Sequence, residues 1–158
     1  MTKGFMSEAM KNVNWEQYSH QGLKSPDFQG LIQDLSSGDE LTRLKAMTEL
    51  ENQLEWAYEK AKNELPYDII PVFIELLRSK DLTDKSVVTS LLLFLLSYSE
   101  YPELEEPYKS KAFRLKKCVC EGIDVYQSFL EDEAYKSLIQ DKDTKEDFNE
   151  LIECCNDK

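Results

Sequence analysis

Two stretches of the sequence, 31–54 and 73–96, match each other when one is displaced by 42 residues along the chain. Apolar residues align with apolar residues, and the polar residues between them also agree. The aligned pairs are Leu31 with Phe73, Ile32 with Ile74, Leu35 with Leu77, Ser37 with Ser79, Asp39 with Asp81, Arg43 with Lys85, Ala46 with Val88, Leu50 with Leu92, and Leu54 with Leu96. A repeat of this length is typical of two-helix units that bury their apolar stripes by stacking.

The first repeat predicts a helix pair. Ser25 is a candidate N-cap, Pro26 suits the first turn, and apolar residues at i, i+3, i+4 and i+7 follow in 28–35. The sequence SSGD (36–39) then predicts a break before a helix from about 41 to 61. We expect its inward residues to be Leu41, Leu44, Met47, Leu50, Leu54, Ala57 and Ala61.

The second repeat contains the most apolar part of the chain. Its first helix is expected to start near Ile69, because Pro71 is tolerated only in a first helical turn. Its second helix, about 83–98, is apolar on nearly all sides, which is typical of a helix with neighbours on both sides. The apolar run 87–96 is shorter than the roughly 18 residues that a membrane span needs, so we expect it in the core.

Helical patterns continue after 108, but two registers for a third repeat stay open, at 132–136 and at 141–145. The residues expected to form the apolar sides are Ala112, Phe113, Leu115 and Val119 in one helix, and Phe148, Leu151, Ile152 and Cys155 in the last. Thr144 is expected to open that last helix, with Asp147 completing a capping box.

Composition agrees with an all-α fold and bounds the function. The chain has only 5 Gly and 5 Pro in 158 residues, too few for the turns of an all-β protein. Its net charge of −12 repels phosphate backbones and would attract a basic partner. A plainer interpretation, in which the acidity only maintains solubility, also stays open.

The cysteines and the only histidine give no support for a cofactor or metal site. Cys118, Cys120, Cys154 and Cys155 lack the spacing of a zinc site, and His20 lies far from them in sequence. The segment 1–10 has no apolar region of the length a secretory signal needs. We therefore expect a cytoplasmic protein with reduced thiols and with no cofactor, metal or nucleic acid.

Aromatic residues among carboxylates mark the candidate binding surface, because Trp and Tyr dominate the energetics of protein interfaces. The candidate protein-binding residues are Glu55, Trp56, Glu59, Tyr98, Tyr101, Glu103, Glu105, Glu106 and Tyr108. The competing interpretation is a solvated face with edge-packed aromatics. A basic cluster within 109–117 is expected to pair with neighbouring acids. No catalytic set is present, because His20 has no partner in a recognisable motif.

The stretches NVNWEQYSH (12–20), 25–50 and IIPVFIELL (69–77) resemble small bacterial HEAT-like repeat proteins. The resemblance implies an α-α superhelix of about three helix pairs and no active site. It implies one solenoid domain over 25–158, with 1–24 as an N-terminal cap segment. Members of this group are similar to immunity proteins that block toxins. The expected function is therefore an immunity-type inhibitor that occludes a basic toxin; the alternatives are an adaptor or scaffold with another client, or an accessory subunit of an enzyme.

Overall fold

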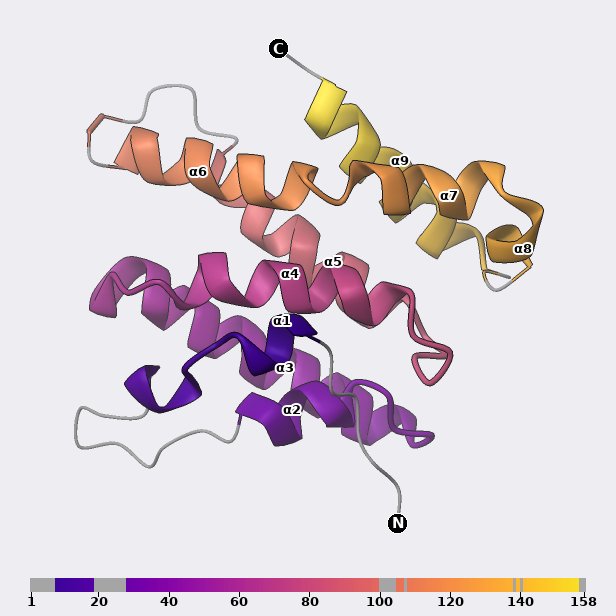
Figure 1. Ribbon diagram of the computed structural model, residues 1–158, viewed down its shortest axis with the longest axis horizontal. Coiled ribbons are helices and arrows are strands. Elements are labelled where there is room, and N and C mark those ends of the chain that lie inside the picture. Colours follow the sequence, from indigo (N-terminus) through magenta and orange to yellow (C-terminus); the bar gives the residue numbers. More distant parts are fainter. Residues whose placement is uncertain are drawn as a thin grey trace. The chain divides into compact units, whose positions relative to one another are not determined.

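The computed structural model describes residues 8–18, 28–99, 105–106, 108–137, 139 and 141–156. These residues form helices, turns and loops, and no strand occurs in this part of the chain (Figure 1). The predicted all-α class is confirmed. The chain divides into two compact units, Met1–Thr83 and Asp84–Lys158, and each unit is described by itself below.

The first unit is built on two long helices. Its elements are α1 (Glu8–Lys11), the 3-10 helix η1 (Trp15–Tyr18), α2 (Phe28–Asp34), α3 (Glu40–Trp56), the π-helix η2 (Ala57–Ala61) and α4 (Leu65–Leu77). The helices α2 and α3 pack as the predicted pair, while α4 packs against α1 and η2. The phenolic hydroxyl of Tyr18 donates a hydrogen bond to the carboxylate of Asp68, which fastens η1 to α4.

The second unit is organised around its last helix. Its elements are α5 (Ser86–Leu96), the 3-10 helix η3 (Ser97–Ser99), α6 (Tyr108–Cys120), α7 (Ile123–Glu131), α8 (Glu133–Lys136) and α9 (Lys142–Asn156). The helix α9 packs against α5, α6 and α7. The apolar run of α5 is buried as expected, and no helix among the described residues is long and apolar enough to cross a bilayer.

The matched polar residues of the two repeats form the same turn. The backbone N–H of Asp39 donates to the Ser37 hydroxyl at 3.1 Å, and the N–H of Asp81 donates to the Ser79 hydroxyl at 3.2 Å. The aligned apolar triplets Ala46, Leu50, Leu54 and Val88, Leu92, Leu96 are all buried. The internal match in the sequence therefore corresponds to a match in local structure.

The predicted start of α4 is wrong. The helix begins at Leu65, with Pro66 in its first turn, and continues through Pro71, which is exposed. A proline inside a helix removes one backbone hydrogen bond. Burial of the long apolar side of α4 outweighs that loss, so the helix extends one turn further toward the N-terminus than the proline rule predicts.

The predicted start of α9 is also wrong. The helix begins at Lys142, and the Asp141 carboxylate caps it by accepting the N–H of Thr144 at 2.9 Å. Asp147 does not complete a capping box with Thr144; its carboxylate instead accepts the hydroxyl of Thr89 on α5. The cap at Asp141 has the same form as the cap of α3, so the punctuation at 141–145 repeats that of the first unit.

The predicted inner face of α3 is wrong at its first turns. Leu41 is 59% exposed and Leu44 is 41% exposed, and Met47 and Ala61 are half-buried. Residues three positions apart differ by about 60° in direction around a helix. The three steps from Leu41 to Leu50 therefore put these two leucines on opposite sides of α3. The buried line follows steps of four through Ala46, Leu50 and Leu54. Phe113 on α6 departs similarly, being 70% exposed.

The predicted reduced state is wrong for two of the four cysteines. Cys120 at the end of α6 and Cys155 near the end of α9 form a disulfide, with their Cα atoms 5.4 Å apart. That separation lies in the ordinary range for disulfides. The bond fastens the last turns of two helices that are distant in sequence.

Candidate protein-binding surfaces

The predicted residues of the first unit lie where α3 continues into η2. Glu55 and Glu59 are exposed, as is Glu49 further back on the same helix. Trp56 is half-buried and has these carboxylates at positions i−7, i−1 and i+3. We call Glu49, Glu55, Trp56 and Glu59 the acidic stripe. The sequence neighbour Tyr58 is instead buried, so Trp56 is the aromatic residue of this surface.

Two exposed residues without negative charge adjoin the acidic stripe, Asn52 between Glu49 and Glu55 and Lys60 directly after Glu59. Asn52, one turn before Trp56, is exposed and supplies an amide rather than a carboxylate. Lys60, at i+4 from Trp56, is exposed as well. The negative charge next to the ring is therefore concentrated at Glu55 and Glu59, one helical turn apart, with Glu49 extending it toward the start of α3.

The stripe ends at a widened helical turn. The carbonyl of Ala57 accepts the backbone N–H groups of both Lys62 and Asn63, the latter at 3.1 Å. Lys62 adopts a left-handed conformation with φ of 52°, which stops the helix three residues after Glu59. This local geometry, which helical periodicity alone does not reveal, fixes the stripe at a helix end rather than in mid-helix. π-turns of this kind are frequent at functional sites.

The predicted residues of the second unit differ in their exposure and in their contacts. The exposed carboxylate of Glu106 accepts the backbone N–H of Ser110 at 3.3 Å and so caps the start of α6, and it also accepts the Ser110 hydroxyl at 2.6 Å. Glu105 is exposed, and Tyr108 is 41% exposed at the first position of α6. Tyr98 is half-buried, with its ring 5.7 Å from that of Phe94 in an edge-on arrangement.

The nine predicted binding residues therefore divide between the units. Three of them, Glu55, Trp56 and Glu59, adjoin one another in the first unit. Four described ones belong to the second unit: Tyr98, Glu105, Glu106 and Tyr108. Tyr101 and Glu103 lie outside the described residues, as do Ser25, Pro26 and His20. The group in the first unit, which Glu49 extends to form the acidic stripe, combines a half-buried aromatic ring with several exposed carboxylates along one continuous helix.

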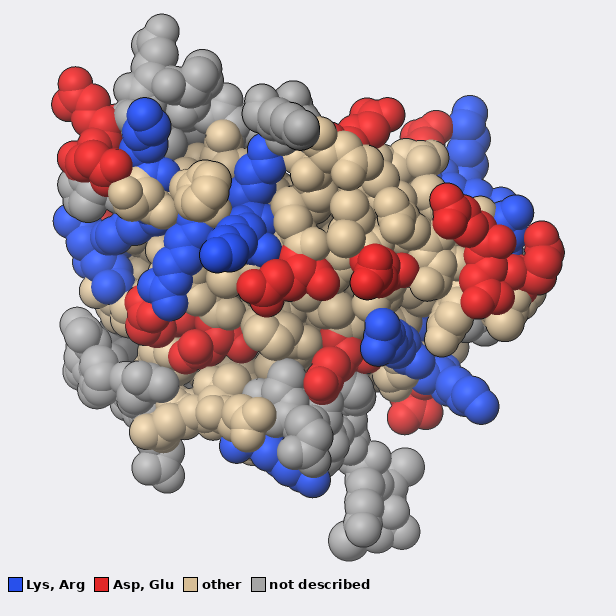
Figure 2. Space-filling model, turned by 45° about the horizontal axis from the view of Figure 1, so that its top comes forward, with Lys and Arg blue, Asp and Glu red and all other residues tan. Residues whose placement is uncertain are grey.

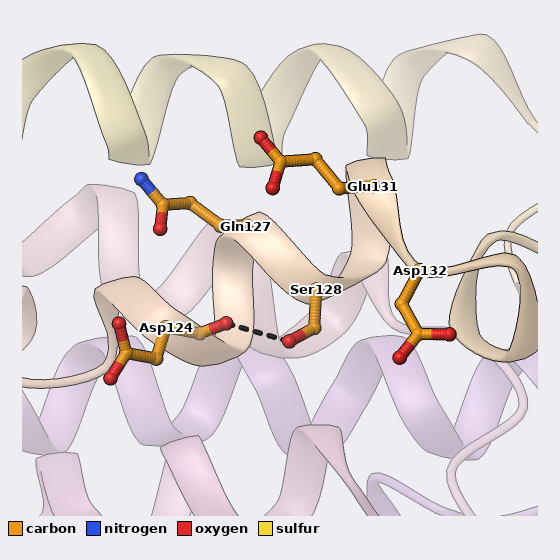
Figure 3. Close-up of a pocket in the computed structure, with 5 residues that line it drawn as sticks. All are labelled: Asp124, Gln127, Ser128, Glu131 and Asp132. Carbon is orange, nitrogen blue, oxygen red and sulfur yellow. Dashed lines mark hydrogen bonds between the residues drawn. The ribbon is translucent and has the colours of Figure 1, made fainter.

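A shallow polar hollow of about 450 Å³ lies along α7 (Figure 3). Its lining residues are Asp124, Gln127, Ser128, Glu131 and Asp132. Two of these already have structural roles: Ser128 donates to the backbone carbonyl of Asp124 at 2.8 Å, and Asp132 caps α8 by accepting the N–H of Ala134 at 3.0 Å. No group of three or more potential metal ligands occurs among the described residues. The hollow is a solvated acidic surface whose lining includes no nucleophile–base pair.

A comparison with protein families, curated proteins and solved structures finds no match for this chain. The resemblance to HEAT-like repeat proteins, the single solenoid domain and the cytoplasmic location stay predictions, as does the expected lack of catalytic residues.

Proposed function

We propose that this protein is a non-enzymatic binding module that captures a basic protein with its acidic stripe. Its most concrete form is an immunity-type inhibitor that occludes a basic toxin, built on stacked HEAT-like helix pairs. The observation that carries the proposal is the position of Trp56, half-buried at the end of α3 with exposed glutamates before and after it.

The stripe supplies the two components that charge-driven capture requires. Exposed carboxylates attract cationic side chains over a distance of about 8 Å at physiological ionic strength, and the net charge of −12 acts in the same direction. The partly accessible Trp56 ring gives an apolar contact that loses water on binding, and such anchors contribute about 2 kcal/mol or more. The carboxylates therefore govern association and Trp56 governs dissociation.

Local structure supports the repeat part of the proposal. Two Ser–Asp turns, at 37–39 and 79–81, and two Asp–Thr caps, at 39–42 and 141–144, make the same local hydrogen bonds, which supports a repeated unit. Turns and helix caps that recur along the chain are expected of stacked repeat units. Stacked helix pairs commonly present extended surfaces to partner proteins.

The test uses a basic protein captured from the source cells and two variants of the stripe. Replacing Glu49, Glu55 and Glu59 together by Gln should lower the association rate by about tenfold or more and flatten its salt dependence. Trp56→Ala should mainly raise the dissociation rate, by about tenfold or more.

The matched control removes the same number of charges from another helix. Glu146, Glu150 and Glu153 are exposed on α9 in the second unit, and their joint replacement by Gln should leave both rates close to those of the wild type. Unchanged rates for both stripe variants would refute the proposal.

A further inference from the structure

The most exposed large apolar side chain of the described residues is surrounded by cations. Phe113 is 70% exposed on α6, with Lys109 at i−4, Arg114 at i+1, Lys116 at i+3 and Lys117 at i+4. We call these five residues the basic face. In Figure 2, Lys and Arg side chains gather at the left, over the region of α6. No acidic residue occurs within α6 itself.

Four residues of the basic face are exposed and Lys116 is half-buried, because the opposite side of α6 is used for packing. Ala112, Leu115 and Val119 are buried on that side. The structure records no ion pair from Lys109 or Lys117 to a described carboxylate, although pairing with neighbouring acids was expected from the sequence. The charges of Lys109 and Lys117 are thus not neutralised by an ion pair with a described carboxylate.

The basic face and the acidic stripe have complementary compositions along a helix. On α6, the exposed ring of Phe113 has cations one helical turn before and after it, so the face covers about 12 Å of helix axis. At the end of α3, the ring of Trp56 has Glu49 two turns before it and Glu59 one turn after it, so the stripe covers about 15 Å. Complementary charges across a contact steer the encounter and favour the matching partner, and these two surfaces have opposite charges and similar lengths.

We propose that the basic face of one copy of this protein docks on the acidic stripe of a second copy. The inference rests on the proposed function, because it uses the same stripe. Each such contact would cover one stripe and compete with a basic partner for it. A reciprocal pair of contacts would cover both stripes, and a tighter-binding partner would open that masked form.

A long polyanion fits the basic face less well than a second copy. Exposed carboxylates lie at both ends of α6, Glu105 and Glu106 before it and Glu121 after it. A nucleic-acid strand that follows the helix would pass over these groups as well as over the cations, and the net charge of −12 would repel it further. A contact limited to about two helical turns, or about 12 Å, reaches the cations alone.

Salt should affect this association in two opposite ways. At about 0.01 M salt the Debye length is about 30 Å, so the net charges of the two copies repel each other. At about 0.15 M it is about 8 Å, and the close pairs between face and stripe dominate. At about 1 M the close pairs are also weakened. The association constant should therefore be largest at intermediate salt. Simple apolar aggregation would instead increase steadily with salt concentration.

The decisive experiment exchanges the charges between the two surfaces. One variant carries Lys109→Glu and Lys117→Glu, and the other carries Glu55→Lys and Glu59→Lys. Sedimentation equilibrium at micromolar to millimolar concentration should show wild-type self-association and monomers for each variant alone. An equimolar mixture of the two variants should associate again, because each modified surface then meets its opposite charge.

A charge reversal elsewhere is the matched control for this exchange. Lys142 and Lys145 are exposed on α9, and the variant with both replaced by Glu should associate like the wild type. Circular dichroism of every variant establishes that each is folded.

The apolar part of the contact has its own variant. Phe113→Ser should weaken self-association by about tenfold or more, because it removes the ring at the centre of the face. Leu41→Ser, at another exposed apolar position, should leave it unchanged.

Several results would overturn the inference. Monomeric wild type at millimolar concentration would do so, as would a mixture of charge variants that stays monomeric. Binding of a single-stranded oligonucleotide or of phosphatidylserine vesicles through Phe113 and Lys109, without self-association, would assign the face to another ligand.

If a basic partner still needs the stripe while copies do not associate, only this inference fails. If Glu55→Lys with Glu59→Lys leaves partner binding intact, the proposed function fails.

Discussion

The ammonium of Lys85 lies 5.7 Å from the centre of the Phe129 ring and is almost completely removed from solvent, with the residue only 4% exposed. Burial lowers the pKa of Lys85 to about 8. The ring face partly compensates the lost hydration of the charge. The start of α5 thus contains a charged group that burial destabilises.

Lys85→Met should stabilise the protein at about pH 7, by about 1 to 3 kcal/mol, because the charged amine is costly to bury. The lowered pKa means that wild-type stability increases as pH rises from about 8 toward the ordinary lysine value near 10.5. The advantage of the variant should therefore shrink over that interval. Urea unfolding at several pH values measures it, with Lys142→Met at an exposed position as control. An advantage that does not change with pH would contradict the assignment.

Removing the disulfide should destabilise the second unit. Cys120→Ser with Cys155→Ser opens a loop of 35 residues, and loop entropy predicts a loss of about 3 to 4 kcal/mol. A dithiol reductant should destabilise the wild type by a similar free energy, and its melting temperature should fall accordingly. The same reductant should not change the melting temperature of the double variant. If it does not change the melting temperature of the wild type either, the bond is absent.

The hydroxyl of Thr89 on α5 donates to the Asp147 carboxylate on α9 at 2.8 Å. Burial raises the pKa of Asp147, and this hydrogen bond opposes the rise. Thr89→Val should lower the free energy of unfolding at about pH 7 by about 1 to 2 kcal/mol, because it leaves the carboxylate without its donor. Thr89→Ser keeps the donor and should have a smaller effect. The loss should diminish in acid, where the carboxyl is neutral, and chemical unfolding at both pH values tests this.

Two leucines test the register of the helices. Leu92→Ala in α5 removes a fully buried side chain and should cost about 2 to 5 kcal/mol. Leu41→Ala in α3 changes a residue that is 59% exposed and should change stability by less than about 0.5 kcal/mol. Thermal unfolding distinguishes these outcomes. Equal losses for the two variants would mean that the first turns of α3 are part of a core.

The sequence predicts most of the helices and the pairing of α2 with α3. Period and punctuation locate α2, α3 and α5 and the turn at Ser79, because local hydrogen bonds and apolar spacing determine these features. The inner face of α3 was not predicted correctly, because steps of three and steps of four fit the same leucines. Only the buried line through Leu50 and Leu54 distinguishes them, and that line depends on the neighbouring helix.

The candidate surface was predicted in part. Composition alone identifies Glu55, Trp56 and Glu59, but the π-turn that ends the stripe depends on backbone geometry around Ala57 and Lys62. Glu49 was missed because it lies two helical turns before Trp56, outside the short stretch in which acids and aromatic residues alternate.

The exposure of Phe113 was missed because an apolar residue within a helix was assumed to face inward. Ala112, Leu115 and Val119 are spaced by three and four residues and so share one side of the helix. Phe113 does not fit that spacing, which would have placed it on the other side.

The bond between Cys120 and Cys155 also makes the end of the chain a covalent ring. The backbone from the end of α6 through α7, α8 and α9 closes on itself through the two sulfurs. A protease that cuts once between α8 and α9 would therefore release no fragment until the sulfurs are reduced. Mass spectrometry would show an intact chain that has gained one water, and reduction would separate it into two pieces.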